Sequence, residues 1–255
     1  MPQYNGTIVT STANQVVNGY FSPSSANVTA TAGTTPTIAL GNARGDTTWV
    51  SGDLALIIQM QCVDINSTDT DAYGDGVAGR PGYGYVETSS GTCKVGQYEY
   101  VPAGAGTSAG SFVAGAALQN TYVQADPTVS TPRRSFQIIR VPQYGNFTLG
   151  GSLAGLAWDG LNGGVIALDV AKTLNFNGQT IDMGAKGFRG GGGRQSSADG
   201  NNPYRHPASG SASHASKAEG IAGTPRLLFI DSTPFSRTST AGTVTDVAAD
   251  RKLTH

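Results

Sequence analysis

Charged residues are scarce in this sequence. They make up 13% of its 255 residues, and 16 Lys and Arg nearly balance 17 Asp and Glu, which gives a net charge of −1. Binding to nucleic acid or to an anionic membrane surface requires a cluster of basic side chains, so we predict neither as a partner. Because Lys and Glu are strong helix formers, their scarcity also argues against a helical protein.

Long apolar runs are absent as well. The longest, at residues 54–58, has the length of a β-strand, and a helix needs about 20 apolar residues to cross a bilayer. We therefore predict no membrane insertion. Residues 1–7 are neither basic nor apolar, unlike a signal peptide. The chain either begins at a processed or recombinant end or is cytosolic, and its cysteines bear on that choice.

Glycine, in contrast, is abundant, at 36 of 255 residues, about twice its ordinary share. Up to residue 43, short β-branched runs recur about every ten residues with Gly, Pro or Asn between them, a spacing typical of all-β proteins. The apolar run at residues 54–60 follows a turn and predicts a strand buried on both faces. Further strands are predicted at residues 97–101 and 136–141.

The stretch from residue 163 to residue 193 is the most informative about architecture. Three short strand-forming runs are joined by corners of two or three residues that carry Gly or Asn. Short strands that turn repeatedly in one sense are typical of a β-solenoid. Asn177 and Gly178 also suit a type I′ hairpin turn. The predicted fold is all-β with a β-solenoid, β-helix-like core and long loops, and an antiparallel β-sandwich is the alternative.

Composition predicts three regions along the chain. Residues 1–193 form a β-rich core, interrupted by an acidic loop at residues 62–93 that a cysteine flanks on each side. Residues 194–226 contain Ser, Asn, Gly and His with almost no apolar side chains, which predicts a polar surface loop. Residues 227–255 hold a last strand, at 227–230, and a polar tail.

The two cysteines, Cys62 and Cys93, lie 31 residues apart on either side of a segment rich in Gly, Asp and Ser. A disulfide is the favoured interpretation, and two buried free thiols are the alternative. No CxxC motif or His partner accompanies them, which disfavours a metal site. A disulfide requires an oxidising compartment, so this pair favours an extracellular or cell-surface location.

The loop between the cysteines is acidic. Four aspartates and one asparagine fall within twelve residues, and hard cations such as Ca²⁺ bind six to eight oxygens. Their spacing does not fit an EF-hand, so any Ca²⁺ site is irregular, and a solvated acidic loop is the alternative. The candidate ligands are Asp64, Asn66, Asp69, Asp71 and Asp75.

Three tyrosines lie in the same glycine-rich excursion: Tyr73, Tyr83 and Tyr85. Tyrosine offers a large contact area at low entropic cost. These side chains are candidates for contact with a sugar or a protein, and tyrosines at a loop tip without a binding role are the alternative.

Two short motifs match catalytic or nucleotide-binding patterns. Residues 106–110 match G-x-S-x-G, which needs a strand before it and a helix after it. Residues 74–79 match G-x-G-x-x-G but follow an acidic loop instead of a strand, which predicts a turn. In a chain this rich in Gly and Ser both matches are expected by chance. We predict no catalytic residues and no enzymatic activity.

A set of motifs, taken in order, resembles a known group of proteins. The group is the amino-terminal, solenoid-like portion of large secreted bacterial surface proteins of the adhesin or haemagglutinin kind, in which a glycine-rich region and repeated modules usually follow. The resemblance implies an extracellular location and no catalysis. The chain departs from the group by its cysteine pair and by ending where the glycine-rich region begins. The motifs lie at residues 51–61, 137–144, 158–160, 163–168, 187–191 and 219–225.

The sequence therefore predicts an extracellular structural or adhesive module of a bacterial surface assembly. Its expected partners are further copies of itself, other surface proteins or glycans. One alternative is a carbohydrate-active β-helix enzyme, which needs converging carboxylates, and the predicted strands offer Asp169 and Asp182. A second is a phage or virion fibre component. Copies can join into filaments through an open solenoid end, unless the tail from Leu227 caps that end and leaves a monomer.

The acidic loop yields a prediction about metal binding. If Asp64, Asn66, Asp69, Asp71 and Asp75 bind Ca²⁺, millimolar Ca²⁺ raises the melting temperature, because a ligand that binds only the folded state stabilises it. Differential scanning calorimetry with Ca²⁺ and with a chelator measures the effect. Superimposable melting curves under the two conditions contradict the site.

Overall fold

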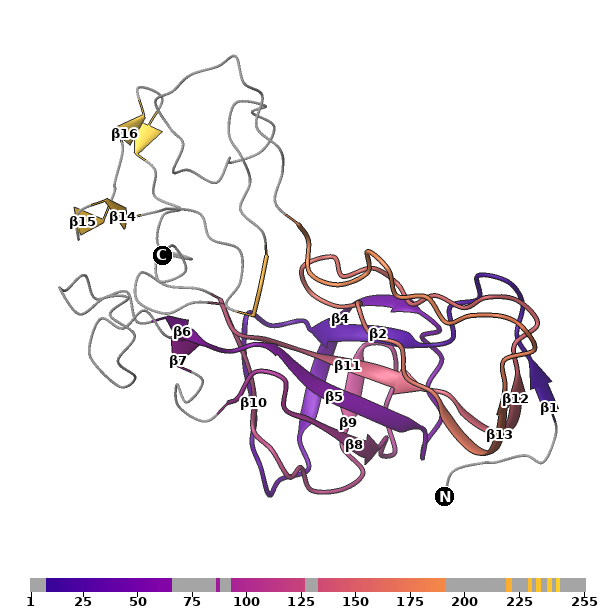
Figure 1. The fold of residues 1–255 in the computed structure, drawn as a ribbon. Coiled ribbons are helices and arrows are strands. Elements are labelled where there is room, and N and C mark those ends of the chain that lie inside the picture. Colours follow the sequence, from indigo (N-terminus) through magenta and orange to yellow (C-terminus); the bar gives the residue numbers. More distant parts are fainter. Residues whose placement is uncertain are drawn as a thin grey trace, which may run out of the picture. The chain divides into compact units, whose positions relative to one another are not determined.

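A computed structural model shows a protein built from β-strands (Figure 1). The residues that it describes contain no helix, which confirms the all-β prediction. It describes residues 8–65, 86–87, 93–126, 133–190 and 219–221, together with the two-residue strands β14 (Phe229–Ile230), β15 (Thr233–Pro234), β16 (Thr238–Ser239) and β17 (Gly242–Thr243).

The chain divides into two compact units. The first consists of Met1–Gln59, Gly96–Gln124 and Phe136–Phe188, and the second of Met60–Val95, Ala125–Ser135 and Arg189–His255. The first unit contains both sheets of three or more strands. In the second, β14 pairs with β15 and β16 with β17, both antiparallel. The surface loop predicted for residues 194–226 lies outside the described residues, apart from 219–221.

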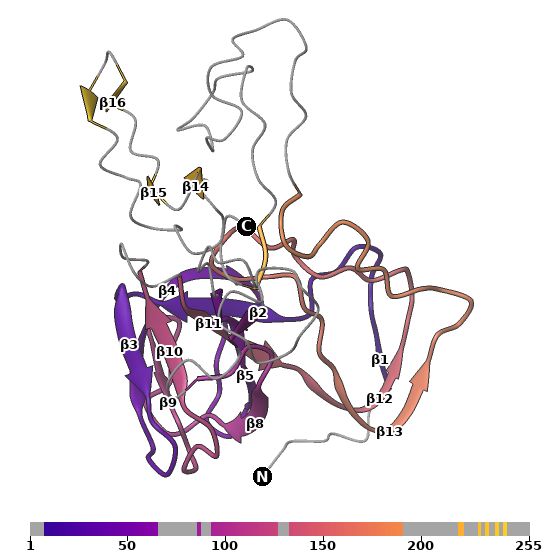
Figure 2. The same cartoon turned by 60° about the vertical axis from the view of Figure 1, so that its left-hand side comes forward.

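The main sheet has six strands in the order β8-β5-β11-β2-β4-β9 and is curled (Figure 2). Strand β2 pairs antiparallel with both β11 and β4, β5 pairs antiparallel with β8, and β4 with β9. A separate two-stranded sheet joins β3 to β10. The bounds are β2 Gly19–Pro23, β3 Asn27–Ala30, β4 Thr37–Gly45, β5 Leu54–Gln61, β8 Tyr98–Pro102, β9 Ser111–Val113, β10 Tyr122–Ala125 and β11 Ser135–Val141.

Strand β5 contributes buried residues to both of its faces, as its apolar run predicts. Ala55 and Ile57 belong to a core cluster with Phe21, Phe112 and other residues, whereas Leu56 belongs to a second cluster. Alternate residues of a strand point to opposite faces of the sheet, so the two clusters occupy opposite sides of it. The partly buried Trp49 closes the first cluster, with ring centroids 5.3 Å from Phe21 and 5.8 Å from Phe112.

A second sheet, of three parallel strands, follows the order β1-β12-β13, with bounds β1 Ile8–Thr10, β12 Gln143–Thr148 and β13 Asp169–Asn175. The parallel alignment continues beyond the strands, because the amides of Leu153 and Trp158 donate to the carbonyls of Thr180 and Lys186. Side-chain hydrogen bonds between Ser152 and Thr180, and between Asn177 and the carbonyl of Leu149, each join residues 28 apart.

The predicted solenoid is not shown, and the antiparallel alternative fits the main sheet. Of residues 163–193 the structure describes 163–190, and these hold one strand, β13, with an isolated parallel bridge between Leu153 and Ile181. Asn177 and Gly178 both have positive φ, 47° and 71°, as in the predicted type I′ turn, but no hairpin flanks them. Short strands with glycine turns suit either architecture, and only long-range pairings such as β2 with β11 decide between them.

Three fully buried amide side chains join neighbouring segments to the sheets. Each donates to a backbone carbonyl and accepts from the backbone amide of the same residue, as a paired strand would. Asn18 binds Ala167 in this way at 2.7 and 3.1 Å. Gln59 binds Val123 at 2.7 and 2.9 Å. The third pair is Gln137 with Gly163, at 2.9 and 2.8 Å.

Replacing one of these amides tests how much it contributes to the free energy of unfolding. In Gln137→Leu the amide and carbonyl of Gly163 lose their partner while still buried, and an unsatisfied buried polar group costs about 1–3 kcal/mol. We expect the free energy of unfolding to fall by about 2–5 kcal/mol in urea denaturation. The control is Gln143→Leu, since Gln143 is only partly buried and hydrogen-bonds to the side chain of Asp169. Equal losses in the two variants contradict the role of Gln137.

Candidate functional site

Among the described residues of the first unit, two tyrosines on the edge strand β8 are the most exposed aromatic side chains. Exposure alternates along β8, so Tyr98 and Tyr100 face outward while Glu99 and Val101 face inward. Tyr98 is 59% exposed and Tyr100 is 52% exposed. Their ring centroids are 6.2 Å apart and the rings stand edge to face, at 84°. An exposed aromatic pair of this kind offers both an apolar surface and two hydroxyl groups.

The register of the sheet extends this surface with apolar side chains. Tyr98 lies opposite Ile58 of β5, Tyr100 opposite Leu56, and Pro102 opposite Leu54. Directly opposed residues lie on the same face of a sheet. Leu54 and Ile58 are only partly buried, so an apolar strip runs beside the two tyrosines. We refer to Leu54, Ile58, Tyr98 and Tyr100 as the tyrosine surface.

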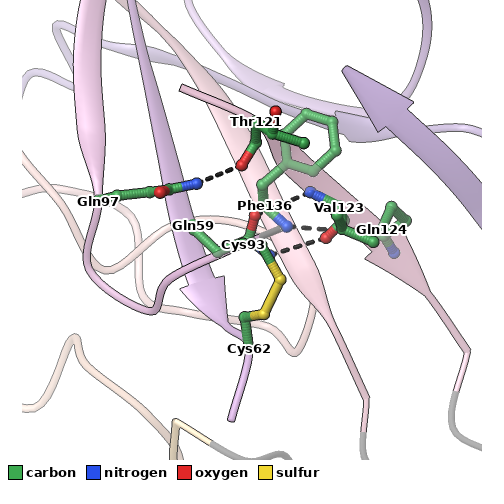
Figure 3. Close-up of a disulfide and its surroundings, with 8 residues drawn as sticks. All are labelled: Gln59, Cys62, Cys93, Gln97, Thr121, Val123, Gln124 and Phe136. Carbon is green, nitrogen blue, oxygen red and sulfur yellow. Dashed lines mark hydrogen bonds between the residues drawn. A yellow bond between two sulfur atoms is a disulfide. The ribbon is translucent and has the colours of Figure 1, made fainter. Parts of the chain in front are cut away.

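The backbone behind the tyrosine surface is held firmly from the other side of β8. The buried carboxylate of Glu99 accepts hydrogen bonds from the amides of Gln119 and Asn120, at 2.8 and 2.9 Å. Just before β8, the side chain of Gln97 donates to the carbonyl of Thr121 (Figure 3). These bonds fix strand β8, which orients its outward side chains before any partner binds.

The buried phenol of Tyr122 lies beside this anchor. Burial is the main reason that its pKa is raised above the ordinary value of 10.0, and the negative charge of Glu99 raises it further. The phenol therefore stays neutral at physiological pH. Its role here is packing, since its ring lies 5.9 Å from that of Phe136.

The disulfide predicted from the sequence is present. Cys62 and Cys93 are paired, with Cα atoms 6.3 Å apart, and neither cysteine is exposed to solvent (Figure 3). Immediately beyond it, β6 (Asp64–Ile65) pairs antiparallel with β7 (Val86–Glu87). The disulfide and this short ladder together tie the base of the excursion between the cysteines, as predicted.

Most of the predicted site residues lie outside the described residues. These are the proposed Ca²⁺ ligands Asn66, Asp69, Asp71 and Asp75, and the loop tyrosines Tyr73, Tyr83 and Tyr85. Of the predicted ligands only Asp64 falls on a described strand, β6, where its backbone lies opposite Glu87. No group of three or more His, Cys, Asp or Glu that could hold a metal ion occurs among the described residues. Calcium binding therefore stays a prediction.

The segment at residues 106–110 is a turn. It leads into strand β9, with Ser108 and Ser111 exchanging backbone hydrogen bonds at 2.7 and 3.2 Å. A nucleophile elbow places its serine between a strand and a helix, and here a strand follows. The two acids named for a carbohydrate-active enzyme have structural partners: Asp169 accepts from Gln143, and Asp182 from the amide of Gly184.

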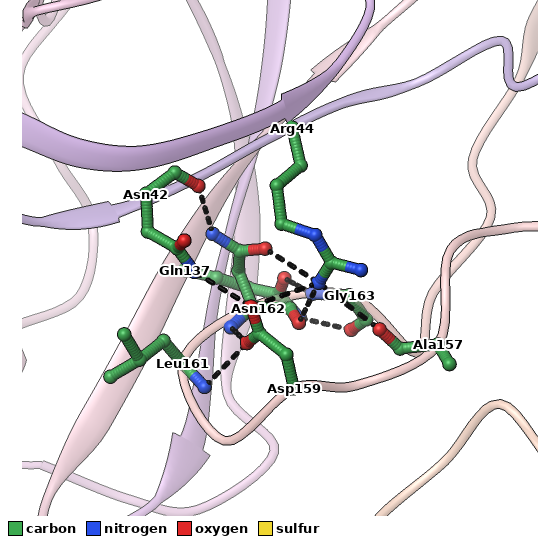
Figure 4. Close-up of polar contacts among 8 residues, drawn as sticks. All are labelled: Asn42, Arg44, Gln137, Ala157, Asp159, Leu161, Asn162 and Gly163. Atoms are coloured by element: carbon green, nitrogen blue, oxygen red, sulfur yellow. Dashed lines mark hydrogen bonds and ion pairs between the residues drawn. The ribbon is translucent and has the colours of Figure 1, made fainter.

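A polar cluster fixes the loop that follows β12 to strand β4 (Figure 4). The guanidinium of Arg44 lies 3.1 Å from the carboxylate of Asp159, and the buried Asn162 donates to the carbonyl of Asn42. Burial tends to raise the pKa of Asp159. Hydrogen bonds from the Asn162 amide, the Asn42 side chain and the Leu161 amide, with the charge of Arg44, outweigh burial and lower that pKa. Asp159 is thereby held ionised in a structural role.

Comparison with family models, curated proteins and solved structures gives no match. The geometry of the chain itself therefore carries the functional argument. Among the described residues no helix is long and apolar enough to span a membrane.

Sequence reasoning missed the tyrosine surface. The sequence predicts a strand at residues 97–101, and the Tyr-Glu-Tyr alternation at residues 98–100 places both tyrosines on one face of it. That signal was available in the sequence. Which face is open to solvent follows only from the tertiary packing, which buries Glu99 and Val101 and leaves Tyr98 and Tyr100 exposed.

The disulfide makes a measurable contribution to stability. Cross-linking residues 31 apart restricts the unfolded chain, which stabilises the folded state by about 3–4 kcal/mol. We expect the Cys62→Ser/Cys93→Ser double variant to lose roughly that free energy of unfolding. Denaturation of both proteins measures the loss, and mass spectrometry of the native, non-reduced protein should detect no free thiol. Two alkylatable thiols in the native protein contradict the bond.

Proposed function

We propose that this chain is an extracellular structural or adhesive module of a bacterial surface assembly, and that its tyrosine surface binds glycans. The single observation that carries the glycan contact is the outward pair Tyr98 and Tyr100, more than half exposed on an edge strand. The resemblance of the sequence to the amino-terminal portion of secreted adhesin- or haemagglutinin-like proteins supports the proposed surface location.

The chemistry of the tyrosine surface suits a sugar. A pyranose ring presents an apolar face of C–H groups and a rim of hydroxyls, and tyrosine presents an apolar ring with a hydroxyl at its tip. The half-buried Leu54 and Ile58 extend the apolar part. The anchoring of Glu99 by two backbone amides keeps β8 rigid, and a preorganised surface loses less entropy when it binds.

The disulfide supports the location in this proposal. Disulfides form and persist in oxidising compartments and are rare in the cytosol, and Cys62 and Cys93 are paired and buried. A low charge density with a net charge of −1 suits neutral glycans better than highly charged partners.

Titration of immobilised polysaccharides and glycans with the purified chain tests the proposal. Hot-spot residues of an interface each contribute more than about 1 kcal/mol to the binding free energy. We therefore expect Tyr98→Ala/Tyr100→Ala to bind at least about tenfold more weakly. Tyr98→Phe/Tyr100→Phe keeps the rings and should retain part of the affinity. Phe176→Ala is the matched control, because it removes an aromatic side chain, 47% exposed, from β13-flanking sequence instead.

Three results contradict the glycan contact. They are a wild-type chain that binds no glycan, a tyrosine double variant that binds like wild type, and equal losses in the double variant and Phe176→Ala. The carbohydrate-active enzyme that the sequence leaves as an alternative would bind glycans and also cleave them. Product analysis of the same incubations by mass spectrometry therefore separates an enzyme from an adhesive module.

A further inference from the structure

The two edge strands of the parallel sheet, β1 and β13, are each paired on one side only within the part of the chain that the structure describes. Among the described residues β1 pairs only with β12, and so does β13 (Figure 2). Residues 171–175 of β13 are all exposed. An exposed strand edge presents unpaired N–H and C=O groups, which makes it a template for a further strand.

A row of apolar side chains across this sheet ends in an exposed residue. Val9, Phe147 and Leu174 are in register on β1, β12 and β13, so their side chains lie on one face. Phe147, in the middle, is 1% exposed, whereas Leu174 is 37% exposed. Phe176, two residues further on, is 47% exposed. A fourth parallel strand beyond β13 would cover Leu174 as β13 covers Phe147.

The backbone directions define what that fourth strand must offer. The carbonyl of Asn175 accepts from Leu149, so Asn175 faces β12 and the backbone of Leu174 faces away from it. On the opposite edge Ser11 donates to the carbonyl of Thr148, so Ser11 faces β12 and Thr10 faces away. The outer edge of β13 and the outer edge of β1 are therefore complementary halves of one parallel ladder.

We propose that β1 of a second copy of this chain adds in parallel to β13, with Val9 of the second copy opposite Leu174. In that register the amide of Leu174 donates to Ile8 and its carbonyl accepts from Thr10, the same alternation as in the existing ladder. Val9 then covers Leu174 and extends the apolar row. Strand β1 carries no charged side chain, so the strand itself places no positive charge beside Lys172 of β13.

The contact uses different surfaces on the two copies, so each added copy exposes a new β13 edge. Such a heterologous contact forms an open filament unless its rotation closes a ring. The inference rests on the proposed function and deepens it, because it names the chain itself as the structural partner. A net charge of −1 gives little repulsion between copies.

Sedimentation velocity of the disulfide-bonded chain over a wide concentration range tests the contact. We expect the wild type to form larger species as concentration rises. Leu174→Lys places a charge on the outer edge of β13. Thr10→Pro removes the outward-facing amide from the outer edge of β1. Both variants should stay monomeric. Val50→Lys is the matched control, because Val50 is an exposed aliphatic residue, 56% exposed, outside this sheet, and it should assemble like wild type.

Mixing the two variants gives a sharper result. Leu174→Lys keeps an intact β1 edge and Thr10→Pro keeps an intact β13 edge, so an equimolar mixture should form a one-to-one dimer and nothing larger. Circular dichroism melting curves check that each variant folds. If either variant is unfolded, hydrogen exchange of the wild type decides, since the Leu174 amide should exchange more slowly at high than at low concentration.

Several outcomes overturn the inference: a wild type that stays monomeric throughout, variants that assemble like wild type, or loss of assembly in Val50→Lys. Protection of the Leu174 amide in a monomer at every concentration also overturns it, and shows that the chain's own residues cover β13. Glycan binding is measured on the same samples below the assembly concentration. A wild type that binds glycan but never assembles refutes this inference alone, whereas a wild type that assembles but binds no glycan refutes the glycan contact alone.

Discussion

The structure depends on buried side-chain amides that hydrogen-bond to backbone N–H and C=O groups in the way a neighbouring strand does. Loops and the short strand β10 bring N–H and C=O groups into the interior, and such groups must find partners there. Asn18, Gln59 and Gln137 supply them by binding both backbone groups of Ala167, Val123 and Gly163. Since the chain has few charged side chains, amides carry a task that ion pairs would perform at a high cost of desolvation.

The few ion pairs hold loops next to strand ends. Arg140 of β11 lies 2.7 Å from the carboxylates of both Asp46 and Asp53, on either side of the connection between β4 and β5. Arg44 holds Asp159 in a similar way after β12. Partly exposed pairs of this kind contribute little energy individually. Their effect is to position the loops relative to the strand ends.

The two sheets offer different kinds of surface. At the edge of the antiparallel sheet, β8 exposes a face of tyrosines whose backbone is anchored through Glu99. At the edge of the parallel sheet, β13 exposes backbone groups and an apolar row that ends at Leu174. The first suits recognition by side chains and the second suits strand addition. The proposed adhesion and the proposed assembly would each use one of these surfaces.

The sequence by itself determined the β-strand composition, the buried apolar strand at residues 54–60, the Cys62–Cys93 pair and the positive-φ turn at Asn177 and Gly178. Each is a local property of residue type and spacing. Tertiary structure alone decided that the main sheet is antiparallel, that β8 and β13 lie at sheet edges, and that Gln59 and Gln137 face inward to bind backbone. These features depend on pairings between segments far apart in the chain, such as β11 with β2, and local pattern carries no information about which distant strand becomes a neighbour.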